Sequence, residues 1–355
     1  MSSQKYVNIS RGPVIEKNRD LSQLNTMGVP VQAKRFTEII KPRELSALHT
    51  SGFFEGTDPI ILGGGSNLLF LNDPDRPVIK ISIPGITITP TKEDLVLMKV
   101  GAGEAWHNVV SNAVENNLGG IENLALIPGT TGAAPIQNIG AYGVELDDCF
   151  HQLTAFHIQS GEFKTYRSEE CRFGYRDSIF KQELKGKVVV CDVTLRLTKK
   201  NHQINTGYKS LAGYLQENCI EDPGIEDVFN AVVAIRQNKL PAPADIGNAG
   251  SFFKNPVVNE SVFKRLQKTH SEIPRYRLGD DKYKIPAGWL IEQTGWKGKR
   301  VGNVGTYKNQ ALVLVNHGGA TGKEIFEHAM RIRNSVREKF GVELQPEVNI
   351  VGRNE

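Results

Sequence analysis

The apolar residues of this 355-residue chain fall into short runs and into longer segments of helical spacing. Apolar runs next to glycine, at residues 60–62 and 95–100, predict buried strands. Apolar positions recurring every three or four residues predict helices at residues 42–51, 225–239 and 323–340, the last ended by a glycine. The pattern therefore predicts strands and helices mixed along the whole chain.

A further helix is predicted from Glu104 to Leu118, because Trp106 and the apolar residues that follow it lie on one helical face. Gly119 stands where a C-terminal glycine cap belongs. We expect Trp106 to belong to the core of the protein. This helix leads the chain into its most unusual segment.

Residues 120–146 are rich in glycine and short apolar side chains, a composition that excludes a long helix and lacks strand alternation. Within it, residues 128–132 (PGTTG) predict a turn whose backbone N–H groups can cradle an anion. A glycine-rich surface loop is the competing interpretation. The flanking apolar residues favour burial, and a buried loop needs partners for its backbone.

A second glycine turn, Gly63-Gly64-Gly65-Ser66-Asn67, follows the predicted strand at residues 60–62. It has neither the GxGxxG spacing of a dinucleotide-binding fold nor the Gly-Lys-Ser/Thr ending of a P-loop. A strand followed by such a turn can still wrap a pyrophosphate with backbone amides and the Ser66 hydroxyl.

Composition restricts the remaining possibilities. With 39% hydrophobic and 23% charged residues and a net charge of +4, the chain is typical of a globular protein and has no basic arm for nucleic acid. Its four cysteines and eight histidines show no metal-ligand spacing, so we expect no metal site. No segment has the length of a signal peptide or membrane span, and scattered cysteines are typical of reduced proteins, so we expect a cytoplasmic protein.

Three longer motifs narrow the interpretation: CRFGYRDSIF at residues 171–180, GNAGSFFKNP at 247–256 and QPEV at 345–348. Together with the two glycine turns, they resemble the UDP-N-acetylenolpyruvoylglucosamine reductase family from about Asn25 to Gly352. The resemblance implies an α+β protein with a vanillyl-alcohol-oxidase-type FAD-binding fold of two subdomains and a C-terminal substrate-binding domain.

The resemblance also implies a domain organisation. It places an N-terminal extension, disordered or loosely packed, at residues 1–22, a first FAD-binding subdomain at 23–86 rejoined by a C-terminal strand within 341–355, a second subdomain at 87–223, and the substrate-binding domain at 224–340.

FAD, bound non-covalently, is the implied cofactor, and NADPH is the implied hydride donor. The absence of a dinucleotide fingerprint is consistent with NADPH using the same cleft as the sugar nucleotide in turn. The residues expected to hold FAD are Gly63, Gly64, Gly65, Ser66, Asn67, Pro128, Gly129, Thr130, Gly132, Gln137, Asn138, Gly140, Ala141 and Tyr142.

The implied reaction is reduction of an enolpyruvyl ether, which develops negative charge beside the substrate carboxylate and then needs a proton. By resemblance, Ser251 donates that proton, and Arg176 and Glu347 stabilise the enolate-like intermediate. The planar fork of Arg176 matches a carboxylate, and a buried, protonated Glu347 can donate a hydrogen bond.

Each of these residues also has a structural interpretation. Arg176 can form a salt bridge with Asp177 or another carboxylate, Glu347 can pair with a nearby cation, and Ser251 can be a turn serine that caps a helix. A serine hydrolase is disfavoured, because the motif around Ser251 lacks the G-x-S-x-G elbow.

The residues expected to contact the UDP-sugar are Tyr208, Lys239 and Asn255, with Lys239 placed near phosphate, and Tyr175, Gln293 and Arg236 are weaker candidates. Tyr208 and Tyr214 both lie in the expected tyrosine loop, and we favour Tyr208 because of its flexible neighbour Gly207.

Two other functions stay open. Another flavin oxidoreductase of the same fold would share the glycine turns without needing Arg176, Ser251 and Glu347. A non-catalytic sugar-nucleotide-binding protein would keep the fold alone. We expect a monomer with no nucleic-acid or membrane partner.

Overall fold

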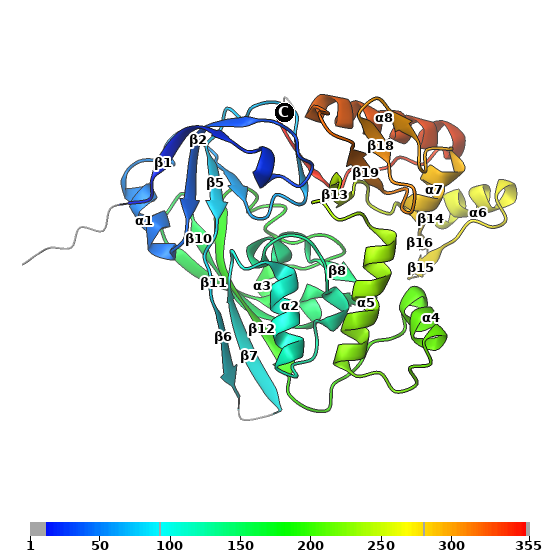
Figure 1. Ribbon diagram of the computed structural model, residues 1–355, viewed down its shortest axis with the longest axis horizontal. Coiled ribbons are helices and arrows are strands. Elements are labelled where there is room, and N and C mark those ends of the chain that lie inside the picture. Colours follow the sequence, from blue (N-terminus) through cyan, green and yellow to red (C-terminus); the bar gives the residue numbers. More distant parts are fainter. Residues whose placement is uncertain (1–11, 92–93, 280, 353–355) are drawn as a thin grey trace, which may run out of the picture.

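The computed structural model describes residues 12–91, 94–279 and 281–352, and these divide into three parts, each built on a sheet of four or five strands with its own helices (Figure 1). The first sheet has the order β1-β2-β5-β3, in which β2, β5 and β3 run parallel and β1 is an antiparallel edge strand. Its elements are β1 (Ile15–Asp20), β2 (Gln32–Ile39), β3 (Ile60–Leu62), β5 (Val78–Ile81), helix α1 (Pro42–Thr50) and the 3-10 turn η1 (Ser22–Leu24).

The second sheet is antiparallel, with the order β11-β10-β12-β7-β6. Helices α2 and α5 run beside each other on one of its faces (Figure 1). The elements of this part are β6 (Ile86–Pro90), β7 (Leu95–Gly101), α2 (Trp106–Glu115), η2 (Glu122–Leu124), η3 (Thr131–Gln137), β8 (Gly140–Ala141), β9 (Val144–Glu145), η4 (Leu146–Asp148), β10 (Phe150–His157), β11 (Phe163–Arg167), α3 (Ser168–Cys171), β12 (Val188–Thr198), α4 (Lys209–Glu217) and α5 (Ile225–Lys239).

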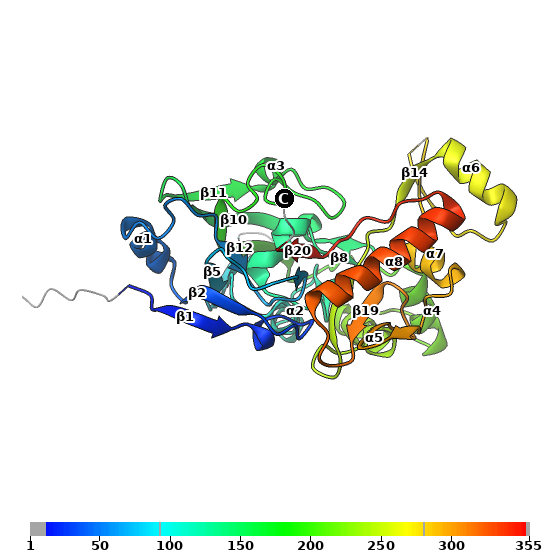
Figure 2. The ribbon, with the colours of Figure 1, turned by 90° about the horizontal axis from the view of Figure 1, so that it is seen from above.

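The third part is built on the antiparallel sheet β13-β19-β18-β17, with a small sheet β14-β16-β15 beside it. Figure 2 shows α8 lying along this part, and α6 at the end of the molecule farthest from α1. Its elements are β13 (Gly247–Ser251), β14 (Val257–Asn259), α6 (Glu260–Thr269), β15 (Tyr276–Leu278), β16 (Lys282–Lys284), α7 (Ala287–Gln293), β17 (Arg300–Val301), β18 (Val304–Thr306), β19 (Val313–Asn316) and α8 (Gly322–Phe340).

The chain returns to the first part at its C-terminal end, as the sequence predicts. Strand β20 (Asn349–Val351) pairs in parallel with β4 (Leu68–Phe70), so the first and third parts share one continuous hydrophobic core. Residues 353–355 of the expected C-terminal segment lie outside the described residues.

Two expected boundaries differ from the structure. Residues 1–11 of the expected N-terminal extension lie outside the described residues, but Ile15–Asp20 forms β1, which is hydrogen-bonded to β2. Helix α5, expected in the substrate-binding domain, places Val228, Ala231 and Val232 in the core of the second part. The interior of the second part therefore extends beyond residue 224.

The predicted helices occur, with one difference in capping. Trp106 is a buried core residue of α2, as expected. The left-handed residue after α2 is Asn117, with a φ of 55°, and Gly119 instead pairs with Thr198 in a β-bridge. Helix α8 ends at Gly341, which has the expected left-handed conformation with a φ of 64°.

Candidate functional site

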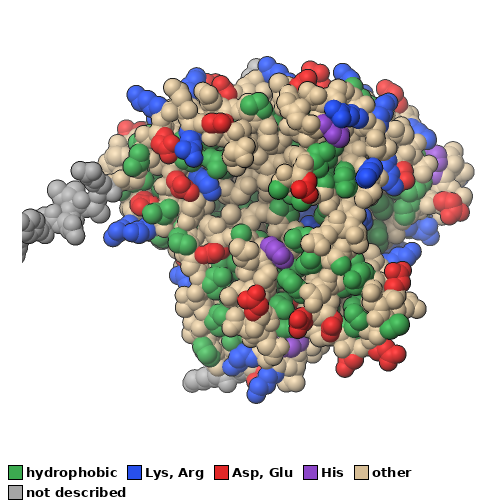
Figure 3. All heavy atoms as spheres, viewed as in Figure 1, with side chains coloured by type: hydrophobic (Ala, Val, Ile, Leu, Met, Phe, Trp, Pro, Cys, Tyr) green, Lys and Arg blue, Asp and Glu red, His purple; other side chains and the backbone are tan. Residues whose placement is uncertain are grey.

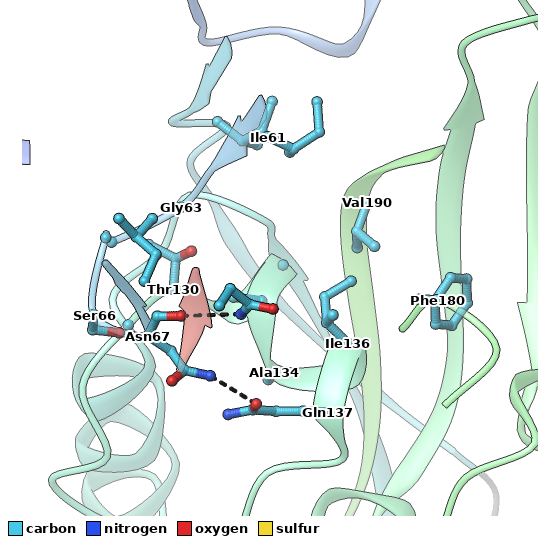
Figure 4. Close-up of a pocket in the computed structure, with 18 of the residues that line it drawn as sticks. Ile61, Gly63, Ser66, Asn67, Thr130, Ala134, Ile136, Gln137, Phe180 and Val190 are labelled. Atoms are coloured by element: carbon cyan, nitrogen blue, oxygen red, sulfur yellow. Dashed lines mark hydrogen bonds between the residues drawn. The ribbon is translucent and has the colours of Figure 1, made fainter. Parts of the chain in front are cut away.

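The two glycine turns of the sequence lie against each other. A Cβ atom added to Gly64 would stand 3.0 Å from the Gly129 Cα, so a side chain here would push the turns apart. The Ser66 hydroxyl donates to the Pro128 carbonyl at 3.1 Å, and the Asn67 side-chain amide donates to the Gln137 Oε1 at 2.8 Å (Figure 4). These contacts join the first and second parts of the fold.

A cavity of about 470 Å³ opens between these turns, within the size range of cofactor sites. Figure 4 shows Ile61, Ile136, Val190 and Phe180 on its apolar side. The predicted cofactor residues that line it are Gly63, Gly64, Gly65, Ser66, Asn67, Pro128, Gly129, Thr130, Gly132 and Gln137.

The composition of this lining fits FAD. Closely approaching glycine turns offer backbone amides to a diphosphate, and the apolar wall suits an aromatic ring system. Arg76 and Lys185 also line the cavity and can neutralise phosphate charge. The sequence analysis missed both residues, because they lie outside the glycine motifs and only the fold brings them to the cavity.

Four other predicted cofactor residues, Asn138, Gly140, Ala141 and Tyr142, do not line this cavity in the described structure. Asn138 is buried, with its side-chain amide donating to Glu145 and to the Gly174 carbonyl. Gly140 and Ala141 form β8 of a two-stranded hairpin. This segment follows the cavity wall and packs against the catalytic candidates instead.

Arg176 is the centre of these candidates. Its Nη1 donates to the Asn138 carbonyl at 3.3 Å, and its Nη2 donates to the Gly140 carbonyl. Two carboxylates flank it: Glu145, 3.4 Å from Nη1, and Glu347, 3.7 Å from Nε. The structural alternative of a salt bridge with Asp177 or another carboxylate therefore occurs with Glu145 and Glu347, whereas the Asp177 carboxylate accepts from the Gln182 side-chain amide.

Glu347 lies close to Ser251 through the backbone. The Glu347 N–H donates to the Phe252 carbonyl at 2.8 Å, directly after Ser251 in the chain. Burial raises the pKa of the Glu347 carboxyl group, whereas Arg176, Lys181 and Lys254 act to lower it. Glu347 thus forms an ion pair with Arg176, which is the structural alternative given for it above. Burial still raises the pKa of Glu347 by more than the neighbouring cations lower it.

Ser251 is the last residue of β13 and pairs with Val313 across a β-bulge. The bulge contains Gly250, whose φ of 66° favours glycine, and its N–H donates to the Asn248 Oδ1. The interpretation of Ser251 as a helix cap is wrong, because the next helix, α6, is capped by Asn259. Bulges of this kind redirect side chains near functional sites.

Tyr175 and Asn255 lie together beside this group. Burial raises the pKa of Tyr175, whereas Arg176 and the nearby Asn255 side chain act to lower it, and the Asn255 Oδ1 accepts the N–H of Ala287 at the start of α7. The Lys284 ammonium lies 4.6 Å from the centre of the Tyr175 ring. Lys284, which the sequence analysis did not select, therefore lies beside Tyr175, one of the residues expected to contact the substrate.

Tyr208 is 42% exposed and immediately precedes α4. Its ring contacts the Tyr142 ring edge-on, with centroids 5.3 Å apart, whereas the competitor Tyr214 packs against the second core. The geometry thus favours Tyr208. Burial raises the pKa of Tyr208, with smaller contributions from Tyr276 and Tyr175.

Gln293 and Lys239 are not joined to this group by any contact within the described residues. Gln293 is exposed at the C-terminal end of α7, where its carbonyl accepts from Lys339, and Lys239 is exposed at the end of α5. Asn255 instead approaches the opposite end of α7, where a Cβ on Gly288 would meet the Gln310 Oε1 at 3.2 Å. Gln310 therefore lies at the end of α7 that Asn255 approaches.

Arg236, a weaker candidate, extends from α5 to the Tyr142 hydroxyl, and its Nε has no hydrogen-bond partner in the described residues. Burial lowers its pKa. A buried guanidinium of this kind suits an electron-rich ligand group.

Several charged residues near Glu347 were missed. Lys181 follows the CRFGYRDSIF motif directly and Lys254 lies inside GNAGSFFKNP. Their positions in or next to the motifs could have marked them as candidates for the site. A lysine without such context is most simply explained as a solvent-exposed residue. Lys181 also donates to Gln137 at 3.4 Å, which connects this group with the cavity lining.

The described residues contain no group of three His, Cys, Asp or Glu side chains arranged for a metal ion. Among residues 12–91, 94–279 and 281–352, no helix has the length and apolar character needed to cross a membrane. On the face shown in Figure 3, acidic and basic side chains are interspersed.

Two family models match separate segments of the chain. Residues 54–166 match a family described as an FAD binding domain, and residues 242–351 match one described as the C-terminal domain of UDP-N-acetylenolpyruvoylglucosamine reductase.

Two curated relatives match nearly the whole chain. The UDP-N-acetylenolpyruvoylglucosamine reductase of Flavobacterium johnsoniae is 45% identical over 95% of this chain and 99% of its own length. That of Pseudomonas aeruginosa is 44% identical, over 95% and 98%.

Among solved structures, a UDP-N-acetylenolpyruvylglucosamine reductase from Thermus caldophilus superimposes with a TM-score of 0.66 at 26% identity, over 96% of this chain and 99% of the other. The expected α+β, vanillyl-alcohol-oxidase-type FAD-binding fold is confirmed.

Proposed function

The chain belongs to the UDP-N-acetylenolpyruvoylglucosamine reductase family, and from this premise we propose how its residues carry out the reaction. It is an FAD-dependent reductase that forms UDP-N-acetylmuramate for peptidoglycan synthesis. The observation that carries the proposal is the contact of Arg176 with Glu347, whose backbone is hydrogen-bonded beside Ser251.

The two glycine turns, Gly63 to Asn67 and Pro128 to Gly132, would hold FAD, which when bound would supply the hydride that reduces the carbon distal to the substrate carboxylate. Arg176 holds that carboxylate and stabilises the negative charge that develops next to it. Glu347, in its protonated form, donates a hydrogen bond to the enolate oxygen, which is consistent with its raised pKa. Ser251 then gives its hydroxyl proton to the carbanion-like carbon, a strong base that needs no acidic donor.

NADPH is proposed as the reductant, using the substrate cleft before the sugar nucleotide enters. Tyr175, Tyr208, Asn255 and Lys239 are proposed to contact the UDP-sugar. Gln310 is the better-placed alternative to Gln293. The enzyme is proposed to be a monomer and to be cytoplasmic, and the second assignment is supported by four cysteines that form no disulfide.

The decisive experiment is anaerobic reduction by NADPH followed by addition of UDP-N-acetyl-3-O-(1-carboxyvinyl)glucosamine. The flavin absorbance should bleach and then return with formation of UDP-N-acetylmuramate. Reduction without reoxidation by this substrate would identify a different flavin oxidoreductase, and a colourless protein would identify a non-catalytic binding protein.

FAD is expected to be bound without a covalent bond, because the described residues that line the cavity include no histidine, cysteine or tyrosine to attach it. Acid or guanidinium denaturation followed by filtration should release all of the yellow colour as free FAD. Colour that stays with the unfolded chain would contradict this.

Tyr208→Phe is expected to raise the KM for the UDP-sugar by roughly tenfold, the cost of one hydrogen bond to a charged group. The structural reason is that Tyr208 is half exposed and supported by Tyr142, so that it can cover a ligand. Flavin reduction by NADPH should change less than the KM. Tyr214→Phe, in the packed part of the same loop, is the control; equal slowing of both half-reactions by Tyr208→Phe would exclude a covering role.

A further inference from the structure

We propose that Glu145 is a positioning residue that holds the Arg176 guanidinium in its catalytic orientation. This inference rests on the proposed role of Arg176. Glu145 ends β9 of the hairpin formed by β8 and β9, and both of its carboxylate oxygens are in use. Oε1 lies 3.4 Å from the Arg176 Nη1, and Oε2 accepts from the Asn138 side-chain amide at 2.8 Å.

Asn138 supports Glu145 from within the protein. It is 1% exposed, its backbone is left-handed with a φ of 44°, and its Oδ1 accepts the Asp147 N–H at 3.1 Å. The side chain of Glu145 is therefore restrained by a group that cannot itself move into solvent. A restrained carboxylate can hold a long, flexible arginine side chain in one orientation, whereas a fully exposed, mobile carboxylate orients its partner poorly.

The hairpin surface is shaped for the guanidinium. A Cβ atom on Gly140 would stand 2.7 Å from the Arg176 Nη1 and 2.9 Å from the Glu145 Cγ, so only glycine permits this approach. Arg176 itself has a φ of 54°, a conformation that non-glycine residues rarely adopt and that is often found at functional sites.

The contacts divide the guanidinium into two sides. Nη1 and Nη2 are bound by the hairpin segment, through the carbonyls of Asn138 and Gly140 and the carboxylate of Glu145. Nε faces Glu347 at 3.7 Å. The hairpin contacts thus fix the plane of the guanidinium, and under the proposed role of Arg176 the side that faces Glu347 is the one presented to the substrate.

The Glu145 side chain can be altered while the backbone contacts of the hairpin remain. Removing this carboxylate leaves the pairing of β8 with β9 available. It also leaves the hydrogen bonds from the Glu145 N–H to the Asp148 carboxylate and from the Leu146 N–H to the Ile139 carbonyl. A substitution at Glu145 therefore tests orientation of Arg176 in a folded protein.

The test is a double-mutant cycle on the FAD-loaded enzyme. Glu145→Ala should slow substrate-driven flavin reoxidation by about 10²-fold, the cost of a misplaced catalytic group, with FAD affinity and NADPH-driven reduction unchanged. Glu145→Gln keeps one acceptor and should recover part of the rate. In an Arg176→Lys background, which keeps the charge without the fork, Glu145→Ala should cause little further loss.

Glu183→Ala is the matched control, because it removes the carboxylate partner of a surface arginine, Arg172, in the same region, and it should reoxidise normally. Normal reoxidation by Glu145→Ala, or an equal loss in both backgrounds, would overturn the inference. Normal reoxidation by Arg176→Lys alone would instead contradict the proposed role of the arginine fork.

Discussion

Ser251→Ala is expected to leave flavin reduction by NADPH nearly intact and to slow flavin reoxidation by the enolpyruvyl substrate by at least roughly 10²–10⁴-fold. Hydride transfer from NADPH needs no proton from a serine, whereas protonation of the enolate-like intermediate does. The two half-reactions, followed separately by anaerobic stopped-flow absorbance, isolate this single step.

Ser251→Cys should recover part of the lost rate, because it retains a transferable proton at the same position. Ser261→Ala, at an exposed serine in the first turn of α6, is the matched control and should behave as the unchanged enzyme. If Ser251→Ala reoxidises at the normal rate, or loses both half-reactions equally, Ser251 is a structural residue of the β13 bulge and another acid is required.

Glu347→Ala is expected to slow substrate-driven reoxidation by roughly 10²–10³-fold, the usual cost of removing a donor to a developing oxyanion. Glu347→Gln keeps an N–H donor and should lose less. Because the protonated form of Glu347 is the proposed donor, the reoxidation rate of the unaltered enzyme should fall as pH rises through its raised pKa. Glu347→Gln should lack this fall; an unchanged pH profile would exclude Glu347 as the titrating group.

The same raised pKa makes a prediction about stability. A carboxyl group with a higher pKa in the folded than in the unfolded protein destabilises the fold as pH rises above its ordinary value of 4.5. Glu347→Gln should therefore unfold at a higher temperature than the unaltered protein near neutral pH, with the advantage disappearing below that value. A less stable variant at neutral pH would show that the ion pair with Arg176 outweighs the cost of burial.

Local sequence pattern determined much of the secondary structure and the chemistry. The helices at residues 225–239 and 323–340 follow from apolar spacing, and the second ends at its glycine because that residue adopts a left-handed backbone. The two glycine turns were recognisable because glycine alone permits close backbone approach. Motifs of ten residues carried the family resemblance, since they are long enough to be specific.

Tertiary structure alone decided which of these residues meet. Arg176 contacts the carbonyl of Asn138, 38 positions away, and the Glu347 carboxylate from the far end of the chain, contacts that no local periodicity encodes. The same limit explains why the sequence analysis singled out neither Glu145 nor Gln310, whose surroundings only the fold reveals. Hydrophobic spacing specifies which face of an element is buried, but long-range packing of whole elements determines which polar groups share a site.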